Sequence, residues 1–281
     1  MTDESLAQFA SPSLMLRMAA SFIAIVLLAA TFAPWISPYG VGGLQEERLL
    51  ETPSWAHWMG TDGLGRDLLT RVLYGARVSL SVGLGTALIA LALGTAYGLI
   101  AGFKGGSWDH FMMRVVDIFY SLPDMLIFIL LSLLFGRNIG GLLVALGLVS
   151  WVRFARIARG QVLQAKEFLF VEGAVALGAS RKRVLLRHIL PNIVGPIIVT
   201  MTFSISSAIL AESTLSFIGI GINDPYSHWG TSWGTLAQDG YRAMRSYPHL
   251  IAFPAAAIFM TILSFNTLGN GLRDLIDPKG R

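Results

Sequence analysis

Four long stretches of the chain carry no Asp, Glu, Lys or Arg, and each is long enough to cross a lipid bilayer as a helix. A hydrocarbon core of about 30 Å needs about 20 helical residues. Inside lipid, backbone N–H and C=O groups must be paired internally, which restricts spans to helices and closed barrels. These stretches lack the alternation of barrel strands, so we expect helices. They cover residues 18–45, 78–103, 188–211 and 246–272.

Two weaker segments complete the predicted set of spans. Residues 115–135 are apolar except for Asp117 and Asp124, and residues 139–155 form a shorter segment that ends close to Arg153. The pattern therefore predicts an all-α, polytopic membrane protein with about six transmembrane helices. Their expected positions are roughly 17–36, 79–101, 114–135, 139–155, 189–210 and 248–268.

The composition agrees with a membrane protein. Hydrophobic residues make up 54% of the 281 residues, and charged residues only 14%, against about 25% in a typical soluble domain. The chain has no cysteine, which excludes disulfides and thiolate chemistry. The first apolar stretch follows Arg17 and is too long for the core of a secretory signal, so we interpret it as a retained span.

The distribution of basic residues predicts the direction of insertion. With six spans and the N-terminus inside, 14 of the 21 lysines and arginines fall in inner segments and 7 in outer segments. Cytoplasmic loops are enriched in Lys and Arg, so we expect both termini in the cytoplasm. This leaves long external segments at about 37–78 and 211–247, and one large internal loop at about 156–188. Tryptophans suited to a membrane–water boundary lie in the external segments at Trp55, Trp58, Trp229 and Trp233.

The internal loop has a pattern typical of two short helices joined by a turn. Residues from Glu172 to Leu177 favour a helix that Gly178 can end, and Ser180 is a suitable N-cap for a second helix that runs to about Pro191. Such a unit could insert into a groove on another protein. The alternative is a loop that lies on anionic headgroups through the basic residues after Ser180. The apolar residues available for a groove are Phe168, Phe170, Val171, Ala174 and Val175.

The same loop resembles the coupling loop, or EAA loop, of ABC importer permeases. Its sequence Glu172-Gly173-Ala174 precedes Gly178 by the spacing of that motif. The departures are Gly173 in place of Ala and His188 at an Ile-like position. A Gly within a short helix costs about 1 kcal/mol relative to Ala. The resemblance implies an ATPase-coupling surface formed by Phe170, Glu172, Gly173, Ala174, Gly178, Leu190 and Pro191.

Two further blocks resemble the "C" permease subunits of dipeptide, oligopeptide and nickel importers. The first is residues 60–67, GTDGLGRD, and the second is residues 215–221, LSFIGIG, which precedes Trp229-Gly230. The resemblance covers nearly the whole chain and implies the type I ABC importer permease fold in a bacterial inner membrane. It also implies three regions: an N-terminal span with an external interfacial segment (1–78), a transmembrane core (79–271) that contains the coupling loop (166–191), and a cytoplasmic tail (272–281).

The function that this resemblance implies is that of a permease subunit forming half of a translocation pathway for di- or oligopeptides. Nickel, glutathione or another small solute is the alternative cargo. The expected partners are membrane lipid, a second homologous permease, two ATP-binding subunits and an external solute-binding protein, with no nucleic acid. No cofactor is expected on this chain, because ATP and Mg would be used by the partner ATPases.

Polar residues within the predicted spans are candidates for solute passage. A charge within the membrane usually faces a cavity or a partner. Asp124, beside Pro123, and Asn266, in the last span, are the candidates for the translocation path. The alternatives are a structural carboxylate for Asp124 and a helix–helix hydrogen bond for Asn266. For Asp117 we favour a hydrated structural carboxylate.

The candidates for an external gate or a contact with the binding protein are Asp62, Arg66, Asp67 and Glu212. The alternative for the first three is to cap and pair an interfacial helix. For Glu212 we expect a structural ion pair with an arginine such as Arg66 or Arg71. A separate stripe of glycines, which we expect to allow close helix packing, consists of Gly94, Gly98 and Gly102.

The main competing functions lack their motifs. The five histidines form no H-E-x-x-H zinc site, no G-x-S-G or G-x-G-D marks an intramembrane protease, and no lysine follows a glycine as a P-loop requires. We therefore expect no metal site and no enzymatic activity. A proton-coupled secondary transporter stays open as an alternative, because Asp124 could titrate.

Overall fold

The computed structural model describes residues 14–40, 42–43, 48–222 and 231–276. Within these residues the regular structure is helical, apart from one isolated bridge between Thr61 and Asp67. The helices are α2 (Leu14–Ile36), α3 (Leu68–Lys104), α4 (Gly106–Tyr120), α5 (Asp124–Phe135), α6 (Ile139–Lys166), α7 (Leu169–Ala176), α8 (Arg181–Arg183), the π-helix η1 (Val184–Ile189), α9 (Leu190–Phe217), α10 (Trp233–Arg242) and α11 (His249–Ile276).

Five helices in the described part of the chain are long and apolar enough to cross a membrane, and a bent pair makes up to six. The five are α2, α3, α6, α11 and the continuous stretch Arg181–Phe217. The bent pair is α4 and α5, which meet at an angle of 85°. The structure therefore confirms the all-α architecture and the expected number of spans, but it changes the third span from one helix into a broken one.

Three other expected boundaries were wrong because charged residues lie inside the helices. Helix α3 begins at Leu68 rather than at 79, since Arg71 and Arg77 belong to its first turns. Helix α6 continues past residue 155 to Lys166, and three of its four basic residues, those after residue 155, were assigned to a loop. The last helix continues to Ile276. The proposed division at 78 and 271 stays a prediction, although α3 runs through residue 78 without a break.

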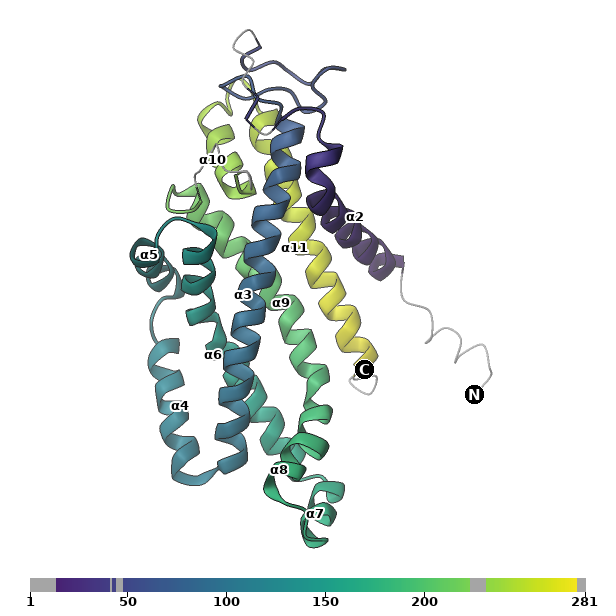
Figure 1. Ribbon diagram of the computed structural model, residues 1–281, viewed down its shortest axis with the longest axis vertical. Coiled ribbons are helices and arrows are strands. Elements are labelled where there is room, and N and C mark those ends of the chain that lie inside the picture. Colours follow the sequence, from purple (N-terminus) through teal and green to yellow (C-terminus); the bar gives the residue numbers. More distant parts are fainter. Residues whose placement is uncertain (1–13, 41, 44–47, 223–230, 277–281) are drawn as a thin grey trace, which may run out of the picture.

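Helix α3 is the central column of the bundle, with α6, α9, α11 and α2 around it (Figure 1). Its contact with α6 is close because three glycines face backbone atoms of α6. A Cβ added at Gly94, Gly98 or Gly102 would meet the carbonyl oxygen of Trp151, Ala155 or Arg159 respectively. The expected packing role of this stripe is confirmed, and the match in spacing sets the register of the two helices.

The two ends of the bundle carry different structures. Helix α10 and the segment before α3 lie at one end, while α7, α8 and the α3–α4 turn lie at the other (Figure 1). Trp55 and Trp58 are exposed at the first end, as a boundary position requires, but Trp233 is buried, and its indole N–H donates to the Val72 carbonyl at 2.9 Å. Trp233 was therefore wrongly predicted as an interfacial residue. Trp229 lies outside the described residues.

Candidate functional site

Helix α7 is a short surface helix whose end is defined by Gly178. The Ala179 N–H donates to the Ala174 carbonyl at 3.0 Å, and the Gly178 N–H donates to the Val175 carbonyl at 2.9 Å. This pair of bonds is a Schellman motif, which needs a left-handed residue after the helix. Gly178 has φ of +79°, a conformation that glycine adopts without strain. The chain thus reverses direction at Gly178.

The chain after this turn differs from the expected second short helix. Ser180 is the N-cap of α8, as predicted, and its Oγ accepts from the Arg183 N–H at 3.4 Å. The helix then does not stop at Pro191 but passes through η1 into α9. Proline is compatible with the first turn of a helix because its missing N–H has no helical partner there. The wide π turns just before Pro191 let the chain continue into the span.

One face of α7 anchors it and the rest is open. Val171 is only 3% exposed. It belongs to a buried apolar cluster that includes Val162 of α6 and Val184 and Ile189 of η1. Val171 was therefore wrongly expected to contact a partner. Outward, Leu169 is 84% exposed and Leu177 is 91% exposed, and Phe168, Phe170 and Val175 are also exposed. The structure thus presents an apolar knob on a fixed base.

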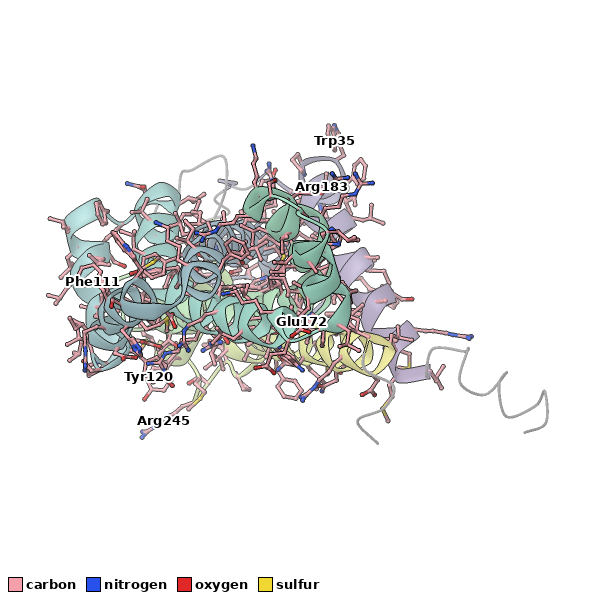
Figure 2. All side chains as sticks on the ribbon, turned by 90° about the horizontal axis from the view of Figure 1, so that it is seen from below. Trp35, Phe111, Tyr120, Glu172, Arg183 and Arg245 are labelled. Carbon is pink, nitrogen blue, oxygen red and sulfur yellow. The ribbon has the colours of Figure 1, made fainter. Side chains whose placement is uncertain are left out.

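The remaining residues of the predicted coupling surface lie on or beside this knob. Glu172 and Gly173 are exposed, and Ala174 is half-buried. In Figure 2, which views the molecule from below, the labelled residues Glu172 and Arg183 mark α7 and α8 on the side nearest the viewer. Leu190 is half-buried and Pro191 exposed at the start of α9. A Cβ added at Gly173 would meet nothing within 4 Å, so packing does not require glycine at this departure from the motif.

A groove runs along the base of the knob, between α7 and the ends of α3 and α6 at Lys104 and Lys166. Lys104, Lys166 and Arg181 give it a basic rim, with Glu172 and Val175 on the α7 side. Lys166 is already engaged, because its Nζ donates to the carbonyls of Gly102 at 2.8 Å and Phe103 at 2.7 Å. These two bonds join the end of α6 to the end of α3 beside α7.

A second candidate site is the cavity beside the break between α4 and α5. It has a volume of about 330 Å³ and lies between α5, α6 and α9. Asp124, the first residue of α5, is on its wall, as the prediction of a cavity-lining carboxylate near a kink requires. Asp117 is instead exposed and paired with Arg156 at 2.7 Å, which agrees with a structural role.

The cavity contains an arginine that the sequence pattern placed at the end of the fourth span. Arg153 lines it and lies near the middle of α6, with its Nη1 donating to Ser207 Oγ at 3.4 Å. The signal that could have found it is the helical periodicity beyond residue 155, where Ala155, Ala158, Val162 and Ala165 are all buried. Asn266 is half-buried on α11 and is not part of this cavity wall, so the structure does not bring it to Asp124.

The external cluster is buried rather than presented to a partner. Asp62 accepts from Arg66 Nε at 2.8 Å, from Arg71, and from the backbone N–H groups of Leu64 and Arg66. Its side chain and that of Arg66 are less than 10% exposed. Asp62 therefore closes the turn before α3, as the structural alternative proposed.

Asp67 has a similar structural environment at the start of α3. Its Oδ2 accepts from the Thr70 N–H at 2.7 Å, which makes it the N-cap. Its Oδ1 lies 2.9 Å from Nδ1 of His57, which is fully buried and stacks on Tyr39. A docking contact through this side chain has no support in the described structure, because both of its oxygens are engaged.

Glu212 does not form the expected ion pair with Arg66 or Arg71. It is fully buried on α9, and Ser79 and Ser216 donate to its carboxylate at 3.1 Å and 2.6 Å. Ser79 also accepts from the Trp233 N–H at 3.2 Å. The two arginines bind Asp62 instead. A buried carboxylate needs hydrogen bonds, and here hydroxyl groups supply them and tie α3, α9 and α10 together.

Together, the membrane-length helices, the projecting knob and the cavity between helices define a membrane transport component. The chain belongs to the family of binding-protein-dependent transport system inner membrane components, whose model matches residues 94–281. Members of this family are permease components of ABC importers. They are not themselves enzymes, because separate ATPase subunits hydrolyse ATP, and a binding protein is a further partner.

Curated relatives resemble the chain over most of its length. The dipeptide transport system permease protein DppC of Bacillus subtilis is 46% identical over 95% of this chain and 82% of that protein. The oligopeptide transport system permease protein OppC of Haemophilus influenzae is 41% identical over 92% of this chain and 83% of that protein. The glutathione transport system permease protein GsiD of Escherichia coli is 41% identical over 93% and 85%.

Proposed function

We propose that this chain is the peptide-importing permease subunit of an ABC importer and that α7 is its ATPase-docking helix. The observation that carries the docking assignment is the exposed apolar knob. Leu177, with 91% of its surface exposed, follows a helix whose opposite face is anchored by buried Val171. Exposed apolar clusters on a rigid base mark protein contacts, and a short helix can fill a groove on a partner.

The orientation follows from the charges around the knob. The end of the bundle that holds α7 also carries Lys104, Arg181, Lys182, Arg183 and Arg187, the last four on α8 and η1. Positive charge near the ends of spans favours the cytoplasmic side. The proposed orientation therefore has α7 in the cytoplasm, where ATPase subunits would bind, and α10 and the segment before α3 outside, where a binding protein would deliver the solute. Both termini are then cytoplasmic.

The remaining parts of the assembly follow from the open surfaces. The cavity beside Asp124 opens to the surface of this single chain, so a second homologous permease would complete the pathway, with one ATPase on each permease. ATP binding by the ATPase pair would supply the differential binding energy that a conformational change requires. Force on α7 would then reach α6 and α9 through the packing of Val171 and through η1.

Peptides are the proposed cargo because relatives with dipeptide and oligopeptide transport names cover most of the chain. Glutathione is the second candidate, since a permease named for it is 41% identical. The experiment is uptake of a labelled dipeptide into proteoliposomes that contain the complete importer. We expect uptake only with ATP and the partner subunits. Uptake by this chain alone, driven by a proton gradient, would contradict the proposal.

A further inference from the structure

The cavity between α5, α6 and α9 carries one negative and one positive side chain that have no ion pair. Asp124 and Arg153 both line it. Within the residues that the structure describes, neither has an oppositely charged group within 4.0 Å, and Arg153 has one hydrogen bond, to Ser207 at 3.4 Å. The neighbouring charges differ, because Asp117 and Arg156 form a pair at 2.7 Å.

The depth of Arg153 in its helix makes an unpaired charge costly there. It lies between Ile139 and Lys166, the ends of α6. At 1.5 Å per residue, about 20 Å of helix lies on each side of it. Charged side chains at such depth are retained where they face a water-filled path, a substrate or each other. A solute in the open side of the cavity that carries both signs of charge would satisfy both side chains.

The rest of the wall suits a small amphipathic solute. Hydroxyl groups are supplied by Ser150, Ser204 and Ser207, and apolar surface by Phe128 and Val149. The volume of about 330 Å³ lies at the lower end of the range of about 300–1,000 Å³ for ligand pockets. A carboxylate attracts an ammonium group, and a guanidinium binds a carboxylate through paired donors. A solute with only one kind of charge would be repelled by one of the two groups.

We propose that Asp124 and Arg153 form a transient binding site for a zwitterionic peptide, with the α-ammonium group at Asp124 and the α-carboxylate at Arg153. This rests on the proposed function, because it takes the cargo to be a peptide. Binding at this site is weak, because both side chains are exposed on the wall of the open cavity. The site recognises the two termini of a short peptide whose length matches the spacing of Asp124 and Arg153, whatever the side chains of that peptide.

The test is a binding comparison between protein variants and blocked peptides. The permease–ATPase complex in nanodiscs, without the external binding protein, is titrated with Ala-Phe, N-acetyl-Ala-Phe and Ala-Phe-amide, and binding is followed by saturation-transfer NMR. We expect acetylation to weaken binding to the unmodified complex roughly tenfold, the value of one charge-assisted hydrogen bond. In the Asp124→Asn variant, acetylation of the peptide should not weaken binding further. Arg153→Gln should remove the effect of the C-terminal amide in the same way.

Two controls keep the result interpretable. Asp124→Glu retains the charge and should retain the discrimination, and Arg137→Gln removes an exposed charge outside the cavity and should leave both effects unchanged. Copurification of the ATPases checks assembly of every variant. Acetylation that costs as much in Asp124→Asn as in the unmodified complex would overturn the site. Absence of saturable binding of Ala-Phe would also overturn it.

The outcome separates this site from the proposed function. If ATP-driven dipeptide uptake is normal but the blocked peptides bind as well as Ala-Phe, only the binding site is wrong. If the complete importer takes up no dipeptide, the peptide assignment itself fails.

Discussion

Gly98 of α3 lies directly against the Ala155 carbonyl of α6, so closely that a Cβ at this position would collide with it. The backbones of α3 and α6 are therefore in direct contact. Small residues permit such close approach in membranes, where van der Waals packing replaces the hydrophobic effect. This contact links the cavity helix α6 to the central column.

Replacing Gly98 with Ala should therefore separate α3 from α6. Overpacking typically costs about 1–3 kcal/mol, so we expect a lower midpoint of thermal unfolding for the detergent-solubilised protein. Gly160 on α6 is the matched control, because a Cβ there meets nothing within 4 Å. Equal midpoints for Gly98→Ala and Gly160→Ala would contradict the packing described.

Gly173 in α7 and Gly178 just after it should respond differently to substitution. Both have open space around an added Cβ, but only Gly178 has a positive φ. Gly178→Val should strain the turn and reduce ATP-driven uptake severalfold, since a β-branched residue disfavours this conformation. Gly173→Ala should be neutral or stabilise α7 by about 1 kcal/mol. Uptake that falls equally in both variants would show that bulk, not backbone conformation, matters here.

The charge on α7 provides a separate test of coupling. Glu172 is exposed on the knob, so Glu172→Arg should leave insertion and folding intact while it weakens ATPase binding. The readouts are the amount of ATPase that copurifies and the rate of ATP-driven uptake. Lys182→Ser, at an exposed site on α8, is the control, because it changes a charge outside α7. Full uptake in Glu172→Arg would remove this residue from the coupling surface.

Glu212 should behave as a hydrogen-bond acceptor and not as an ion-pair partner. Glu212→Gln keeps one oxygen that can accept from one of the two hydroxyls, Ser79 or Ser216, and its amide N–H group can donate to the other, so it should cost little. Glu212→Leu leaves buried hydroxyls without an acceptor and should destabilise the protein by about 1–3 kcal/mol. Thermal unfolding of the purified protein distinguishes the two. A Gln variant as unstable as the Leu variant would indicate that the negative charge itself is needed.

The sequence predicted much of the architecture because uncharged runs of membrane length have few alternative structures. It also located α7, since Glu172 through Gly178 carry both helix propensity and a stop signal. Prediction failed where tertiary contacts decide the environment of a charge. Arg153 ended an apolar run and was placed at the end of a span, although buried residues continue beyond it for three turns.

Glu212 and Asp62 show the same limit. Both were recognisable as charges near span ends, but their partners lie far away in sequence or compete with one another. Arg66 and Arg71 both form ion pairs with Asp62, which is close to them in sequence. Glu212 instead accepts hydrogen bonds from serines on α3 and α9. Sequence alone could not rank these pairings, because it does not show which side chains share a buried space.

The most direct test of the central claim uses the absence of cysteine from the chain, which makes any introduced cysteine unique. Leu177→Cys, on the knob, and Trp55→Cys, exposed at the opposite end, are placed separately in the complete importer and treated with a membrane-permeant bifunctional cross-linker. The account predicts a cross-link between residue 177 and an ATPase subunit, and none from residue 55. A cross-link to the ATPase from residue 55, or none from residue 177, would contradict it.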